Sequence, residues 1–390
     1  MRVVKVLFFI LCIGQSLFTF GQSFKDRFSY RGYFKDMRVV SIAKDTSNNT
    51  QTLQQNLLHH RLNTRLQLDT SWQLGLELRN RAFYGEFLKY APGYGDLLEQ
   101  DPGLVDLSWS WINGPNLVVH TAIDRLWLNY SKNNWDIRIG RQRINWGQNV
   151  VWNPNDLFNV LNYADFDYEE RPGSDAVKVQ RYLKNNSSVQ LAYKFTEDFE
   201  DAVFAGMYRF NKKNYDFQVL AGKYNRDVAL GVGWAGNIKG SGFKGESTYF
   251  QPLDDSLSRV VLTSISWDMS YSNGLYVLVS GLHNSNGTND LNRLLTLSGA
   301  SGGQLDLKNL MPNKYSLFIQ GSKAINPLVN ASLAAIVALD LGGVFAMPTI
   351  TVSVKQNLDM SLVGQSFLGV VDDKVSALSN AVFLRFKWSY

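Results

Sequence analysis

Polar and apolar residues alternate one by one along much of this chain, and no other feature constrains the fold as strongly. Two adjoining segments, 58–68 and 72–79, show it best, because leucines there alternate with Arg, Asn, Gln and Glu. A short Asp69-Thr70-Ser71 turn separates the two segments. Successive side chains of a strand point to opposite faces, so the pattern predicts a β-hairpin with one apolar and one polar face. Its recurrence down the chain predicts an all-β fold.

The connections between the expected strands alternate in length. Every second connection is a short polar turn, whereas the three longest, at 85–116, 145–175 and 283–312, belong to the other class. Bacterial outer-membrane barrels combine short periplasmic turns with longer outer loops, whereas a β-sandwich or a propeller would have turns of more uniform length. We therefore predict, over residues 22–390, one transmembrane antiparallel β-barrel of about 18 strands, with 16 or 20 as alternatives.

The two ends of the chain predict export to an outer membrane. Basic residues near the start precede an apolar run, 6–20, in the layout of a signal peptide, and we expect residues 1–21 to be cleaved. The only cysteine, Cys12, lies in that run, so the mature chain would contain no disulfide. Residues 380–390 alternate in polarity and end on an aromatic residue. They resemble the terminal strand recognised by the bacterial barrel-assembly machinery, so we expect that machinery and outer-membrane lipid as partners.

Composition and motifs argue against other classes of protein. After the N-terminal run no apolar stretch of about 20 residues occurs, so membrane-spanning helices are not expected. The net charge is +5, but the basic residues are spread singly along the strands, which argues against nucleic-acid binding. No zinc, phosphate-loop or dinucleotide motif occurs, and we therefore predict no enzyme activity and no cofactor. No nucleophile or carboxylate partner stands at a suitable spacing from His59, His60, His120 or His283.

The polar face of the expected strands is rich in basic residues. That face would line the lumen, because a strand in lipid must turn its apolar residues outward. Rings of Arg or Lys inside a pore favour anions, so we predict a channel for small hydrophilic, anionic solutes. Alternatively, these charges only keep the lumen hydrated. The acidic residues on this face are fewer, namely Asp69, Glu77, Asp136 and Asp216. The basic residues are Arg61, Arg65, Arg79, Arg138, Lys178, Lys194, Arg209, Lys355, Arg385 and Lys387.

Residues 141–175 form the long connection with the most unusual composition. They are dense in Asn, Asp, Pro, Arg and aromatic residues, and a loop of this length is commonly functional. We predict that this segment folds into the barrel and forms its constriction. The candidate lining residues within it are Arg141, Arg143, Asp156, Glu170 and Arg171.

Two groups of residues within this segment each have two interpretations. The acidic residues Asp165, Asp167 and Glu169 are a candidate calcium site, since calcium prefers oxygen ligands. We favour instead that the acidic cluster pairs with the nearby arginines and pins the loop inside the barrel. Trp146 and Trp152 are either a platform on which sugars stack or anchors for the loop, and we favour the anchors.

A set of short motifs runs through the same stretch: Gly140-Arg141-Gln142, Trp146-Gly147, Asn153-Pro154-x-Asp156 and Glu170-Arg171-Pro172-Gly173-x-Asp175-Ala176. As a set, they resemble a signature of alginate-export-like porins and related barrel families. The resemblance implies an outer-membrane channel. Alginate exporters have eighteen strands and an arginine-rich pore, so export of an acidic polysaccharide or another polymer is a second possibility. A structural or adhesive barrel whose loops block the pore is a third.

Overall fold

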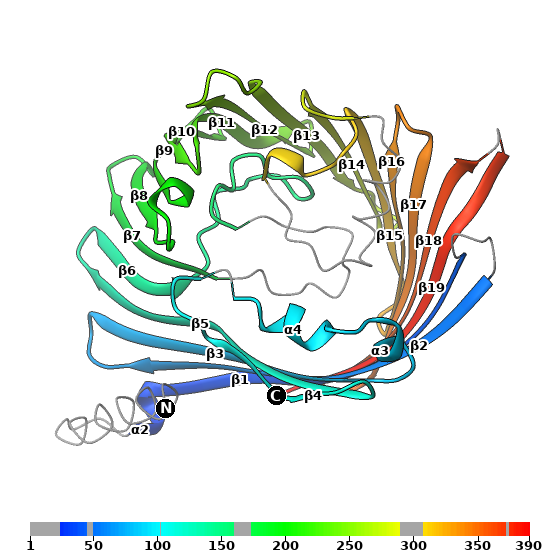
Figure 1. The fold of residues 1–390 in the computed structure, drawn as a ribbon. Helices are drawn as coiled ribbons and strands as arrows, with labels where there is room; N and C mark the ends of the chain where they lie inside the picture. The colour runs from blue at the N-terminus through cyan, green and yellow to red at the C-terminus, as the bar shows by residue number, and fades with distance from the viewer. Residues whose placement is uncertain (1–23, 45–49, 102, 160–172, 289–306, 372–373) are drawn as a thin grey trace.

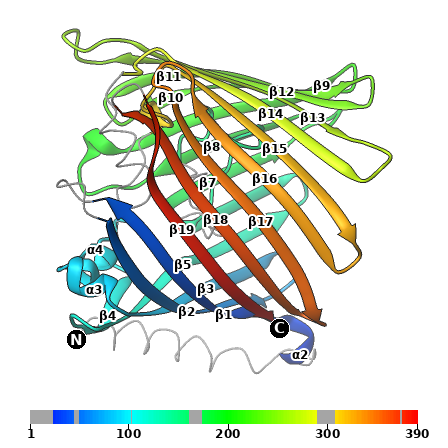
Figure 2. The same cartoon turned by 90° about the vertical axis from the view of Figure 1, so that its right-hand side faces the viewer.

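The computed structural model describes residues 24–44, 50–101, 103–159, 173–288, 307–371 and 374–390. They form one antiparallel sheet that closes into a barrel (Figures 1 and 2). The strands are β1 (Phe28–Lys44), β2 (Thr50–Gln67), β3 (Trp72–Tyr84), β4 (Ser108–Asn113), β5 (Leu117–Lys132), β6 (Trp135–Gln142), β7 (Ser174–Tyr182), β8 (Ser188–Lys194), β9 (Val203–Lys212), β10 (Tyr215–Tyr224), β11 (Asp227–Ile238), β12 (Ser241–Pro252), β13 (Val260–Ser270), β14 (Leu275–Asn284), β15 (Tyr315–Asn326), β16 (Val329–Ala338), β17 (Gly343–Lys355), β18 (Leu358–Val371) and β19 (Lys374–Ser389). The short helices are α2 (Phe24–Arg27), α3 (Phe87–Tyr90), α4 (Tyr94–Glu99), η1 (Phe199–Asp201) and η3 (Leu307–Asn309).

The barrel wall has 18 strands. Consecutive wall strands pair with each other, and β1 pairs with β19 to close the ring. Strand β6 pairs with residues 126–132 of β5. The additional strand β4 pairs with residues 118–122 of β5, where β6 no longer reaches. Closure leaves no strand edge of the ring without a partner, which is what lipid demands of a sheet. The prediction of an 18-stranded antiparallel barrel is therefore confirmed.

Alternation places apolar side chains on the outer face of the wall. On β19, Val382 and Trp388 are exposed, whereas Phe383, one residue further along, packs against apolar side chains inside the barrel. The outward apolar rows continue around the ring, for example at Leu230 on β11 and Leu333 on β16. Among the residues that the structure describes, no helix is long and apolar enough to cross a membrane.

The connections follow the predicted alternation between tight turns and longer loops. The predicted Asp69-Thr70-Ser71 turn lies between β2 and β3, and another short turn, at 133–134, joins β5 and β6. Several turns place an asparagine at positive φ, as at Asn133, Asn214 and Asn357, which suits the two-residue turns of β-hairpins.

Two connections contain regular structure that alternation alone does not indicate. Strand β18 continues to Val371, and β19 begins at Lys374. The pairing of the two strands extends to Val371↔Lys374, beyond the strictly alternating residues 380–390. The long connection 85–116 contains α3, α4 and β4.

Candidate channel constriction

An inner segment, residues 143–159, leaves the end of β6 and runs inside the barrel (Figure 1). Its large side chains are buried: Trp146 is 0% exposed and Trp152 is 3% exposed. They pack against apolar side chains on the inner face of the strands from β7 to β18. The wall residues in this cluster include Ala192, Ala205, Leu220, Phe250, Leu262 and Phe318. The two tryptophans therefore anchor the segment, and the alternative of a sugar-stacking platform is wrong.

Burial against this wall explains why the segment folds inward. The inner faces of these strands carry Ala, Leu and Phe, which would otherwise line a water-filled lumen. Removing one such large side chain from water contributes about 1.5–3 kcal/mol. Covering the apolar wall thus stabilises both the wall and the segment.

Glu246 on β12 is the central polar anchor of the segment. This side chain is fully buried, and its carboxylate accepts the backbone N–H groups of Gln148, of Asn149 at 2.6 Å and of Asn155 at 3.0 Å. The three donors lie at both ends of one turn of the inner segment. A single carboxylate therefore fixes the shape of residues 148–155 and ties that turn to the wall.

Two asparagines add contacts from the segment to the neighbouring strands. The side-chain amide of Asn149 donates to the Ser264 hydroxyl at 2.7 Å. The amide of Asn155 donates to the Val232 carbonyl at 3.0 Å, and the Thr248 hydroxyl donates to its oxygen at 2.7 Å. These hydrogen bonds satisfy polar groups that are buried between the inner segment and the wall.

Arg141 ties the wall to the long connection that precedes it. Its guanidinium group contacts Asp101 at 2.6 Å and Asp175 at 2.8 Å, and it donates to the Val105 carbonyl at 2.6 Å. In the strand register Arg141 shares the parity of the outward-facing Ile139, and it is only 6% exposed. The prediction that Arg141 lines the pore is wrong, because its charge is enclosed by two carboxylates.

A second inward-folded loop narrows the barrel on another side. Leu88 on α3 is buried, and Tyr94 on α4 packs beside it. Their partners on the wall are Met37, Leu57 and Phe83, which lie on the inner face of β1, β2 and β3. Helices α3 and α4 lie inside the ring in Figure 1. Residues from two long connections therefore occupy the lumen.

The inner face of β2, β3 and β5 carries a cluster of arginines around two carboxylates. Glu77 accepts the guanidinium groups of Arg61 at 2.8 Å and Arg125 at 3.0 Å, and Arg65 lies at 3.7 Å. Four positive groups and two negative groups give the cluster a net charge of +2, counting the carboxylate of Asp124. The four arginines are Arg61, Arg65, Arg79 and Arg125.

The arginines of this cluster differ in their access to solvent. Arg61 is fully buried between Glu77 and Asp124, so it supports the wall and does not meet a solute, contrary to its predicted pore-lining role. Arg79 contacts Asp124 at 2.8 Å with a side chain 24% exposed, and the side chain of Arg65 is 36% exposed. The accessible part of the cluster is therefore positive.

The remaining predicted basic residues of the strands also lie on the inner parity, except Lys355, which follows a register shift in β17 and lies opposite Leu358. Arg138 stacks over the Trp127 ring at 4.2 Å, and Lys178 lies 3.7 Å from Asp136. Arg385 donates to the Ser361 hydroxyl at 3.3 Å. Lys387 lies over the Tyr33 ring at 4.5 Å. These contacts hold the side chains along the wall and leave the positive charge on the lumen side.

The other predicted residues of the constriction have different outcomes. Asp156 is 0% exposed and accepts the Trp146 backbone N–H at 3.3 Å, so it supports the inner segment and does not line an open pore. Arg143 is half-buried at the start of that segment. Glu170 and Arg171 lie outside the described residues, as do the candidate calcium ligands Asp165, Asp167 and Glu169. Within the described part of the chain, no group of three or more His, Cys, Asp or Glu could hold a metal ion.

Two carboxylates of the site were missed from the sequence. Asp124 lies where the register of β5 against β3 shifts, between the pairs Glu77↔Arg125 and Leu78↔Ile123. A bulge of this kind changes which residues face inward, so simple alternation cannot assign them. Glu246 stands on the polar parity of β12, but nothing in its sequence surroundings indicates that a distant loop would dock on it.

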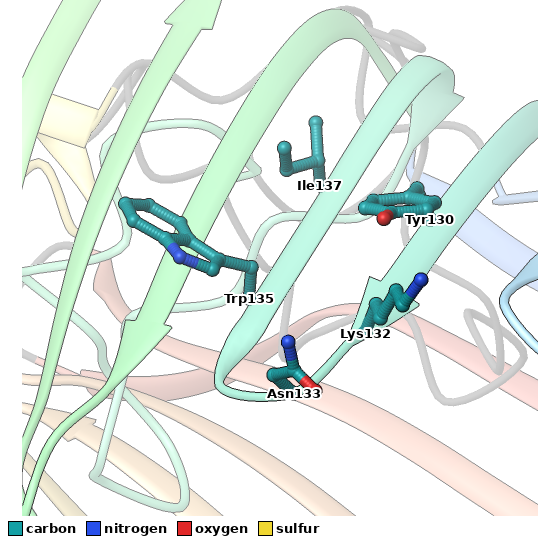
Figure 3. A pocket seen from close by; sticks show the side chains of 5 residues that line it. All are labelled: Tyr130, Lys132, Asn133, Trp135 and Ile137. Atoms are coloured by element: carbon teal, nitrogen blue, oxygen red, sulfur yellow. The ribbon is translucent and has the colours of Figure 1, made fainter.

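One shallow pocket lies on the outer side of the wall and not in the lumen. It is lined at the β5–β6 turn by Tyr130, Lys132, Asn133, Trp135 and Ile137 (Figure 3). Tyr130 and Ile137 are cross-strand partners with the outward parity. Aromatic and basic residues at such a rim suit the interface between lipid and water.

Comparison with known proteins supports the barrel architecture. No family model matches it, and no curated protein matches its sequence. Its structure is similar to that of a BenF-like porin from Pseudomonas fluorescens Pf-5, with 9% identity, a TM-score of 0.57, and coverage of 94% of this chain and 100% of the other. The fold is that of outer-membrane porins.

Two further solved structures share this fold. Pseudomonas aeruginosa OccK11 (OpdR) has 8% identity and a TM-score of 0.55, with coverage of 92% of this chain and 96% of the other. Acinetobacter baumannii OccAB3 has 9% identity and a TM-score of 0.53, with coverage of 93% and 99%. Sequence identities this low support a shared fold but do not indicate which solute passes. The solute must be argued from the residues of this chain.

Proposed function

We propose that the protein is an outer-membrane channel through which small hydrophilic solutes diffuse, with a preference for anions. The observation that carries this proposal is the net positive cluster on the inner face of β2, β3 and β5. Positive groups inside a narrow, low-dielectric wall attract anions more strongly than the same groups on an open surface. The apolar outer face and the closed ring support the location in the bacterial outer membrane.

The two halves of the lumen have different roles in this proposal. The inner segment covers the apolar wall from β7 to β18 and reduces the cross-section. The opposite wall, formed by β1, β2, β3, β5 and β6, keeps its charged groups toward the lumen. A solute would therefore pass between the inner segment and the basic wall, so that it meets Arg65 and Arg79 on its way.

A second candidate function is export of an acidic polysaccharide or another polymer. The motif resemblance to alginate-export-like porins and the arginine-rich wall both favour it. Two inward-folded loops argue against a wide polymer path, because α3, α4 and the inner segment all occupy the lumen. A purely structural or adhesive barrel would need no charged inner wall, and conductance separates it from both channels.

The test is solute entry into liposomes that contain the purified, refolded protein. Swelling rates should be higher for a small organic anion than for a cation of the same size, and both should exceed those of protein-free liposomes. An acidic oligosaccharide should enter slowly if the channel serves small solutes. Equal rates for anion and cation would contradict the anion preference, and no swelling from protein shown to be folded would contradict a channel.

A further inference from the structure

A pair of opposite charges lies on the outer face of β1. Asp36 and Arg38 are 3.8 Å apart in the middle of this 17-residue strand, and the Arg38 side chain is 66% exposed. Their parity is that of Phe34 and Val40, which are 51% and 41% exposed on the outer face. The intervening Met37 is buried inside the barrel. The charges therefore face the surroundings of the barrel and not its lumen.

Three of the four positions paired with these charges on the neighbouring strands are apolar, and the fourth is Asn56 on β2, opposite Arg38. Across the pairing with β19, Asp36 lies opposite Phe386 and Arg38 opposite Leu384. Across the pairing with β2, Asp36 lies opposite Leu58, which is 49% exposed. Charged residues facing lipid at mid-strand are strongly unfavourable, so acyl chains are a poor environment for this pair.

A line of hydrogen-bonded polar groups runs beside the pair on the same outer face. Tyr390 and His60 lie 2.9 Å apart, and His60 lies 3.2 Å from the amide of Asn80. The Thr121 hydroxyl donates to the Asn80 oxygen at 2.8 Å, and the Trp111 indole donates to that hydroxyl at 2.9 Å. The line crosses β2, β3, β5 and β4, whereas outward positions on β11 and β16 carry leucine and valine. The polar character is therefore concentrated on one sector of the outer wall.

We propose that this sector, the outer face of β1 to β5, is the contact between two copies of the chain in the membrane. The patch contains both signs of charge, so it is complementary to itself. In an isologous contact, residue i of one copy meets residue j of the other and the reverse. Asp36 of each copy can then pair with Arg38 of the other, and both charges leave the lipid. The inference depends on the proposed membrane location but not on the solute.

Disulfide trapping tests this contact directly. Leu58→Cys places a thiol beside Asp36, and Leu230→Cys on β11 is the matched control, because Leu58 and Leu230 are 49% and 50% exposed on the outer face. Both variants carry Cys12→Ser, which removes the only native cysteine. Copper phenanthroline, an apolar oxidant, is applied to the proteins in lipid bilayers. We expect a covalent dimer from Leu58→Cys and monomer from Leu230→Cys.

A second variant separates the contact from the fold. Asp36→Leu with Arg38→Leu should lower the native mass from two chains to one, while single-channel steps persist, since neither residue faces the lumen. A single-chain mass for the unaltered protein in lipid, or equal cross-linking of both cysteine variants, would overturn the proposal. A cross-link to a protein of another mass would also overturn it. If the unaltered protein shows no current steps, the result would refute the channel function and not the contact between copies.

Discussion

Replacing Glu246 by Gln is the sharpest perturbation of the inner segment. Glu246 accepts three backbone N–H groups, and a hydrogen bond to a charged group contributes about 1.5–3 kcal/mol. Gln retains one acceptor for Gln148 and Asn149 but turns an N–H₂ donor toward the N–H of Asn155. One bond is therefore lost and two are weakened, which we estimate at about 2–5 kcal/mol.

The apolar anchors of the segment set the scale against which this loss acts. Five large side chains of the segment are buried, at about 1.5–3 kcal/mol each, or roughly 8–15 kcal/mol together. They are Ile144, Trp146, Trp152, Leu157 and Phe158. The substitution should therefore loosen the turn at 148–155 without expelling the segment from the barrel.

Single-channel recording distinguishes these outcomes. We expect Glu246→Gln to increase the current noise of the open channel. Its conductance step should be smaller than that of a variant in which residues 149–167 are deleted. Glu200→Gln, at an exposed carboxylate in η1, is the control and should record as the unaltered protein does. Unchanged noise in Glu246→Gln, or a step as large as that of the deletion, would refute the assignment of Glu246 as a local anchor.

Three further outcomes follow from the same contacts. Deleting residues 149–167 should raise conductance, because it removes the inner segment that fills part of the lumen, and an unchanged step would contradict the constriction. Arg141→Ala should destabilise the barrel by about 3–5 kcal/mol in urea unfolding, because the buried carboxylates of Asp101 and Asp175 lose their shared cation; a loss similar to that of Arg38→Ala would contradict this role. Burial alone would raise the pKa of Asp340, but hydrogen bonds from the side chain of Asn313 and the N–H of Lys314 lower it below its ordinary value. A carboxyl with a lowered pKa stabilises the fold above its unfolded-state pKa, and this contribution is lost as the pH falls through the folded-state pKa. Acid should therefore expose the connection at 339–342 to protease, and equal cleavage at acidic and neutral pH would contradict the contact.

The ring could be predicted from the sequence because lipid imposes a strict rule on each strand. Outward residues must be apolar and inward residues can be polar, so alternation along β2, β3 and β19 is visible in the residues themselves. Turn chemistry is equally local, and asparagines mark several of the hairpin tips. Strand ends outside the apolar band lack this constraint, so alternation does not show that the pairing of β18 and β19 extends to Val371↔Lys374.

The site was less predictable because it depends on contacts between distant parts of the chain. Parity placed Arg65, Arg79 and Arg138 on the inner face, but it cannot show which arginines other groups enclose. Arg141 was assigned to the pore because it lies in the long connection 141–175, whereas its partner Asp101 comes from an earlier loop. The docking of the inner segment on Glu246 spans nearly a hundred residues, and no local pattern reports it.

The central claim is that solutes pass a net positive wall, and the reversal potential under a salt gradient tests it most directly. The refolded protein in a planar bilayer, with potassium chloride at different concentrations on the two sides, should give stable steps that reverse at a potential of the anion-selective sign. Arg65→Gln with Arg79→Gln should move that potential toward zero. A cation-selective sign in the unaltered protein, or no shift in the double variant, would contradict the account.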